Sequence, residues 1–165
     1  MDINKTSYID WSQVPYCRIT PEAQPVYRLG KGDVVVIRMA DPGKAGIVEQ
    51  QEEAIFASYL IRIAIKDKRL RPYFLFYLLS SSAYQDYVSG ASTGTTRKSA
   101  SAGVITDFSF VMPPQEVIAE FEERATSLRA LLTTLLLQSV NLRRTRDLLL
   151  PRLLSGQLAL DESAA

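Results

Sequence analysis

The sequence predicts an α+β fold, in which a small mixed β-sheet domain precedes one long coiled-coil helix. Over residues 1–113, short β-branched and aromatic runs alternate with turns rich in Gly, Pro and Asp. Residues 115–150 contain neither Gly nor Pro, and strong helix formers dominate them. We therefore expect a domain over 1–113, a helix over 114–150 and a C-terminal tail over 151–165.

The domain is expected to contain several short strands. Residues 33–38 form a β-branched run between two Gly-containing turns, and residues 46–49 are the expected partner strand across the second turn. Residues 55–65 alternate between two faces in their second part, with the two-residue period of a strand. One or two further short strands are predicted from residues 104–105 and 108–111.

One helix and one loop are expected between these strands. Pro72 suits the first turn of a helix, where its missing N–H costs nothing, and this helix is predicted over 73–88. Residues 90–103 consist of Gly, Ser, Thr and Ala around one Arg–Lys pair, which predicts a flexible loop. The unpaired Cys17 is expected to be a buried or half-buried small apolar residue.

The predicted long helix carries an apolar residue at every seventh position, and a second apolar series lies three residues before the first. This is the heptad pattern of a coiled coil. At 1.5 Å per residue the helix would reach roughly 55 Å, so its apolar stripe requires a partner helix. The second series weakens at Ser139 and Arg146. The expected seam consists of Ile118, Phe121, Leu128, Leu132, Leu135, Leu142 and Leu149.

The composition excludes several classes of catalysis. The 165 residues include no His and one Cys, so a Ser-His-Asp triad, a Cys-His pair and a His-bearing zinc site are impossible. The acidic residues Glu49, Glu52 and Glu53 are expected to be solvated. We therefore predict no catalytic residues, no metal and no cofactor.

The apolar stretches are shorter than the roughly 20 residues that cross a bilayer, and the first residues lack the features of a signal peptide. A cytoplasmic protein without a membrane partner is expected.

The net charge of +1 is an average over an uneven distribution, because residues 54–115 carry seven basic and three acidic side chains. The turn 38–46 and the loop 92–99 combine cations with backbone freedom, and such segments can contact phosphate oxygens or base edges. From the residues alone, the alternatives are a hairpin tip with incidental charge and a solvated connecting loop.

Four segments carry the motifs of one known family in the family's order. Residues 29–35 read LGKGDVV, residues 94–96 read GTT, and residues 111–114 read VMPP. Residues 141–156 read NLRRTRDLLLPRLLSG, which is similar to the ending R-D-x-L-L-P-[KR]-L-x-S-G. Together they resemble the target-recognition domain and the following conserved helix of the specificity subunit of type I restriction-modification systems.

The resemblance implies a non-catalytic subunit that binds double-stranded DNA sequence-specifically and directs partner methyltransferase and restriction subunits to the target site. It implies that the long helix pairs, as a spacer, with a second recognition half or with a copy of itself. The DNA contacts expected on this basis are Arg38, Lys44, Thr95, Thr96, Arg97, Lys98 and Ser99.

The chain differs from a full subunit of that family, which carries two recognition domains and two long helices. It has one of each, and its domain lacks the family's usual opening segment. A half-subunit or a C-terminal piece is therefore expected. The alternative is a truncated coiled-coil module that binds partner subunits without recognising DNA.

Overall fold

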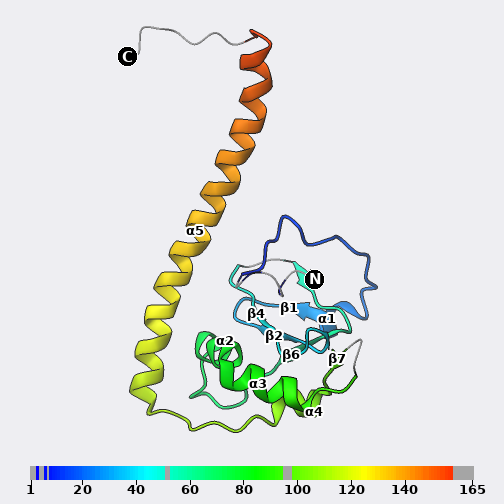
Figure 1. Cartoon of the computed structure of the whole chain (residues 1–165), viewed down its shortest axis with the longest axis vertical. Coiled ribbons are helices and arrows are strands. Elements are labelled where there is room, and N and C mark those ends of the chain that lie inside the picture. Colours follow the sequence, from blue (N-terminus) through cyan, green and yellow to red (C-terminus); the bar gives the residue numbers. More distant parts are fainter. Residues whose placement is uncertain (1–2, 4–5, 7, 51–52, 95–97, 158–165) are drawn as a thin grey trace. The chain divides into compact units, whose positions relative to one another are not determined.

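The computed structural model describes Ile3, Thr6 and residues 8–50, 53–94 and 98–157. The chain divides into two compact units, Met1–Glu123 and Arg124–Ala165. The first contains small antiparallel sheets with short helices, and a long C-terminal helix follows (Figure 1). The predicted α+β class is confirmed.

A three-stranded antiparallel sheet in the order β4-β2-β6 forms the centre of the first unit. The middle strand β2 (Val34–Ile37) lies within the predicted run 33–38, and all four of its residues are buried. It pairs with β4 (Ala45–Ile47) and with β6 (Leu60–Ile63). Among the described strands, this β-branched run is the one with partners on both sides, in keeping with its apolar character.

Two ribbons complete the strands. β1 (Arg28–Leu29), which follows the short helix α1 (Gln24–Tyr27), pairs with β5 (Ala54–Ile55), and β3 (Met39–Ala40) pairs with β7 (Lys98–Ser99). Every strand pair in the described residues is antiparallel, where a mixed sheet was expected. The strand predicted over 55–65 is two strands, because a turn separates β5 from β6.

The alternation of side chains along β2 divides the core into two clusters. Val34 and Val36 pack among the side chains of the helices, including Phe76 and Tyr84. Val35 and Ile37 point to the opposite face and pack with Leu29, Val48 and Ile3. Because successive residues of a strand face opposite sides, one four-residue strand contributes to both cores.

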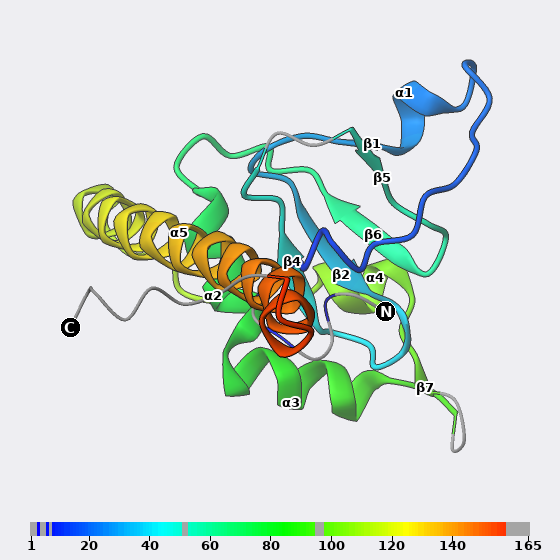
Figure 2. The ribbon, with the colours of Figure 1, turned by 90° about the horizontal axis from the view of Figure 1, so that it is seen from above.

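The helix predicted over 73–88 is two helices, α2 (Pro72–Ser80) and α3 (Ser82–Ala91), which both appear in green in Figure 2. Ser81 separates them with an extended backbone, and its Oγ accepts a hydrogen bond from the N–H of Tyr84 at 3.4 Å. A serine hydroxyl at this N-cap position accepts a hydrogen bond from a free N–H of α3 and so favours the start of a second helix.

The strands predicted at 104–105 and 108–111 are wrong. The first segment lies in the helix α4 (Ala102–Thr106), and the second has no regular secondary structure. Ser101 Oγ accepts a hydrogen bond from the N–H of Val104 at 3.2 Å, so a helix cap overrides the β propensity of two apolar residues. Tyr84 Oη donates to the buried Ile105 carbonyl at 3.1 Å, and burial raises the pKa of Tyr84 to about 12.

The long helix is α5 (Gln115–Leu154), which Figure 1 shows as one continuous helix. It starts directly after Pro114 and continues four residues beyond the predicted end at residue 150, through Pro151. Pro151 cannot donate the helical hydrogen bond to the carbonyl of Asp147, but only three helical residues follow it, so the interruption stays at the end of the helix. Gly156, with φ of 71°, lies just beyond the end, where a left-handed residue is common. No helix in the described ranges has both the length and the hydropathy to cross a membrane.

The first turns of α5 cap helix α2. The carboxylate of Glu122 accepts hydrogen bonds from the N–H groups of Tyr73 at 3.2 Å and Phe74 at 3.0 Å. The N-cap residue of α2, Arg71, makes no side-chain cap of its own. A residue 49 positions downstream therefore neutralises the positive end of this helix.

Two residues assigned to the coiled-coil seam lie in this same region of α5. The ring of Phe121 packs edge-to-face on Phe74 and Tyr77, with centroids 5.9 and 5.6 Å apart. Ile118 is 1% exposed. Ile118 therefore has no surface left for a partner helix, and its predicted seam role is corrected. Phe121 packs on its own domain but is 37% exposed, so its seam role stays a prediction.

Glu122→Ala is expected to lower the free energy of unfolding by about 1–2 kcal/mol, because two N–H groups of α2 lose a charged acceptor. Glu116→Ala is the matched control, since Glu116 is exposed on the same helix. Urea unfolding followed by circular dichroism measures both changes as a shift in midpoint at constant slope. Equal shifts for the two variants would contradict the capping role.

Candidate nucleic-acid interface

The structure brings the two cationic segments of the sequence together. In the ribbon β3–β7, Met39 pairs with Ser99 and Ala40 pairs with Lys98. The N–H of Ala100 also donates to the carbonyl of Arg38 at 2.9 Å. Strands of two residues have no detectable periodicity, so no signal in the sequence could have predicted this pairing.

The ends of the loop are held at a fixed separation. The N–H of Thr93 donates to the carbonyl of Ser99 at 3.0 Å, and the N–H of Ser99 donates back to the carbonyl of Thr93 at 2.9 Å. The predicted contacts Thr95, Thr96 and Arg97 lie outside the described residues. At the base of this loop, Lys98 is exposed and Ser99 is half-buried.

Helix α3 supports both segments. Gln85 Nε2 donates to the carbonyl of Gly43 at 2.9 Å, next to Lys44 in the turn between β2 and β4. Lys98 Nζ donates to Ser89 Oγ at 3.4 Å, and Figure 2 shows β7 beyond the end of α3. The supporting role of Gln85 was not predicted, since a lone glutamine in a helix carries no signal for it.

Two cations of this region, Arg38 and Lys44, are not engaged elsewhere in the described part of the chain, whereas Lys98 donates to Ser89. The guanidinium of Arg38 and the ammonium of Lys44 make no hydrogen bond or ion pair there, and Arg38 Nε is a buried donor without a partner. An unsatisfied buried donor costs about 1–3 kcal/mol, which a ligand acceptor could recover once the side chain reorients. Other arginines are engaged internally, as Arg62 is with Asp33 at 3.7 Å and Arg69 is with Asp67 at 2.7 Å.

The turn that carries these cations is also strained. Ala40 has φ of 74°, in the left-handed region that costs a non-glycine residue about 1–2 kcal/mol. The pairing of Ala40 with Lys98 holds this conformation. Strained backbone of this kind is often found at binding sites, where the surrounding structure maintains it.

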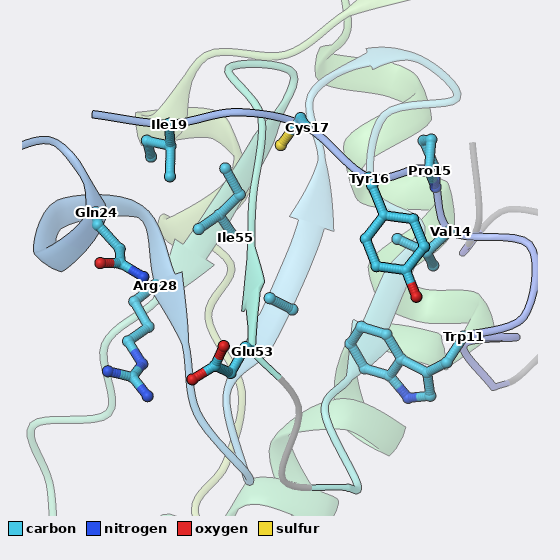
Figure 3. Close-up of a pocket in the computed structure, with 11 residues that line it drawn as sticks. Trp11, Val14, Pro15, Tyr16, Cys17, Ile19, Gln24, Arg28, Glu53 and Ile55 are labelled. Carbon is cyan, nitrogen blue, oxygen red and sulfur yellow. The ribbon is translucent and has the colours of Figure 1, made fainter. Parts of the chain in front are cut away.

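A second feature of the first unit is a hollow of about 260 Å³ between residues 11–19 and the ribbon β1–β5. Figure 3 shows Trp11 and Tyr16 on one side of this hollow, and Arg28 and Glu53 away from them. Cys17 also lines it and is exposed, so its predicted burial is wrong. Residues 15–20, which contain Cys17, have no regular secondary structure.

The hollow offers little for catalysis. The chain has no histidine that could activate the Cys17 thiol. Within the ranges that the structure describes, no three His, Cys, Asp or Glu residues are grouped so that they could hold a metal ion. The cationic surface around β3 and β7 is therefore the better candidate site.

The second unit carries the rest of the predicted seam. Leu128, Leu135, Leu142 and Leu149 are 66, 53, 70 and 42% exposed, and Leu132 is half-buried. Residues seven apart lie on nearly the same side of an α-helix. These leucines therefore form an exposed apolar stripe along α5.

Comparisons with known proteins do not assign the chain to a family: neither a scan against protein-family models nor a search of curated proteins found a match. Its function is therefore argued from the residues and their geometry.

Proposed function

We propose that this chain is the DNA-binding specificity subunit, or half-subunit, of a type I restriction-modification system. In this role it has no catalytic residue and directs methyltransferase and restriction subunits to a target in double-stranded DNA. The observation that carries the proposal is the juxtaposition of Arg38, Lys44 and Lys98 on two segments supported by one helix. The motif order of the sequence supports the same function.

The geometry suits recognition of a duplex. Thr93 and Ser99 pair through their backbones at the base of the 93–99 segment, and the composition of these residues supplies hydroxyls and cations. Arginine can bind guanine through two hydrogen bonds, whereas lysine contacts phosphate as a point charge. Arg38 is the described arginine of this region, and its buried Nε has no partner there, so the side chain would have to turn outward to reach a base.

The proposal includes pairing of α5 with a second copy of the chain. The exposed leucines from Leu128 to Leu149 support it, because an apolar stripe of this length is unfavourable in water. The same stripe also supports the second candidate function, a coiled-coil module that binds partner subunits without recognising DNA. Selection of bound DNA separates the two.

Selection from a pool of random 40-bp duplexes, at 50 and 200 mM salt, tests the DNA-recognition function. We expect enrichment of a short sequence, and we expect Arg38→Ala to weaken binding of the enriched duplex about tenfold or more, because a two-bond contact contributes about 1–3 kcal/mol. Arg146→Ala is the control, since Arg146 is an exposed arginine paired with Asp147 at 2.6 Å.

Absence of any enriched sequence, with or without an added methyltransferase subunit, would contradict DNA recognition. If the chain still bound the methyltransferase, the interaction module would be the supported function. Equal losses for Arg38→Ala and Arg146→Ala would remove Arg38 from the site.

A further inference from the structure

A second cationic surface lies at the end of the sheet opposite the β3–β7 ribbon. In the register of the sheet, Ile37 pairs with Leu60 and Val34 pairs with Ile63. Because β2 and β6 are antiparallel, the residues after Ile37 and the residues after Ile63 leave opposite ends of the sheet. Arg38 therefore lies at one end, and the loop 66–71 begins at the other.

This second end combines two segments. The turn 30–33 contacts the start of α2, since a Cβ on Gly32 would lie 3.6 Å from Pro72 Cγ. Lys31 in that turn is thus near the loop 66–71, which directly precedes Pro72. We call these two segments the 31/66–71 surface. Its exposed cations are Lys31, Lys66, Lys68 and Arg71, together with Arg69, which is paired with Asp67.

The loop is held in one conformation by its acidic residue. Asp67 Oδ1 accepts a hydrogen bond from the N–H of Arg69 at 2.9 Å, and its carboxylate also accepts bonds from the Arg69 guanidinium at 2.7 to 3.2 Å. The N–H of Leu70 donates to the Asp67 carbonyl at 3.0 Å, which closes a turn.

The other carboxylates near this end are engaged with the protein. Asp33 Oδ2 accepts from the N–H of Gly30 at 2.8 Å, and Glu49 Oε1 accepts from Tyr73 Oη at 3.3 Å. Glu122 accepts the two bonds from α2 described above. All three are half-buried, whereas the cations are exposed. Asp67 is exposed but paired with Arg69, so the charge presented to solvent is mainly that of Lys31, Lys66, Lys68 and Arg71.

We propose that the 31/66–71 surface binds the phosphate backbone of double-stranded DNA, outside the sequence that the 93–99 loop contacts; this inference rests on the proposed DNA-binding function. Three of its five cations are lysines, and lysine favours phosphate contacts without base recognition. β2 spans about 10 Å at 3.3 Å per residue, so the two surfaces are close enough to contact one duplex several phosphates apart.

Binding of the intact chain to a mixed-sequence 40-bp duplex, measured at 50 to 300 mM salt, tests the inference. The variant combines Lys31→Gln, Lys66→Gln and Lys68→Gln. We expect the slope of log affinity against log salt to fall by about 1–3, since each phosphate contact contributes about 0.9. We expect affinity for the enriched duplex and the mixed duplex to fall in the same proportion. The control combines Arg143→Gln, Arg144→Gln and Arg152→Gln, which changes the net charge equally with exposed residues of α5.

An unchanged slope in a variant that unfolds at the wild-type urea midpoint would overturn the inference and leave the proposed function standing. The same fall in the control would also overturn it, because the effect would then follow net charge. The wild-type chain could bind DNA without sequence preference while the salt slope falls only in the lysine variant. That result would support the inference and contradict sequence-specific recognition. A wild-type chain that binds no DNA would overturn both.

Discussion

An alanine at Gly43 is expected to lower the free energy of unfolding by about 2–4 kcal/mol, because it combines a left-handed backbone with a steric conflict. Gly43 has φ of 96°, and an added Cβ would lie 3.1 Å from Val88 Cγ1 and 3.2 Å from Val88 Cβ. Val88 is fully buried in α3 and cannot move away without disturbing the core. The turn that carries Lys44 would therefore have to shift.

Gly90→Ala is the matched control for this substitution. Gly90 is exposed in the same helix that Gly43 contacts, and an added Cβ would meet nothing within 4 Å. Alanine is the better helix former, so this variant is expected to gain about 0.5–1 kcal/mol. Urea midpoints at constant slope measure both changes. A Gly43→Ala variant within about 0.5 kcal/mol of the wild type would contradict the tight packing of the turn on α3.

Displacement of the turn should also disturb the proposed DNA site, because the turn carries Lys44. The carbonyl of Gly43 accepts the hydrogen bond from Gln85 that supports the turn. We expect Gly43→Ala to weaken DNA binding even where the protein remains folded, whereas Gly90→Ala should bind as the wild type does. Parallel binding and unfolding measurements at one low temperature separate the two effects.

Leu135→Glu is expected to weaken self-association of the chain by more than about 100-fold. If α5 pairs with a second copy, Leu135 from each chain loses its burial, which contributes about 1.5–3 kcal/mol per side chain. A charge would also enter the seam, at further cost. Sedimentation equilibrium over a range of protein concentrations measures the change.

Leu137→Glu is the control for the seam. Leu135 and Leu137 are both 53% exposed on α5, so the cost of the substitution within one chain is similar. Leu137 lies about 200° further around the helix, away from the predicted seam. We expect it to change association by less than about threefold. Equal effects of the two variants, or a wild-type chain that stays monomeric at high concentration, would contradict pairing of α5 with a copy of itself.

Much of the candidate site was visible in the sequence as residue types, but not as an arrangement. Cations in the turn 38–46 and in the loop 92–99 were predicted to contact DNA from their chemistry. Their proximity depends on Met39 pairing with Ser99 across 60 positions of the chain. The support from Gln85 depends on a similar long-range contact. Neither contact has a local pattern from which it could be predicted.

The sequence by itself determined those elements whose cause is local. A β-branched run between turns was enough for β2, and the absence of Gly and Pro was enough for nearly all of α5. Local patterns failed where two local causes competed, as at Ser81 and Ser101, whose hydroxyl caps decided the helices. They also could not show that Glu122 caps α2 from 49 positions away. Only the tertiary structure decided such contacts, because the free energy of a hydrogen bond or an apolar contact depends on distance in space.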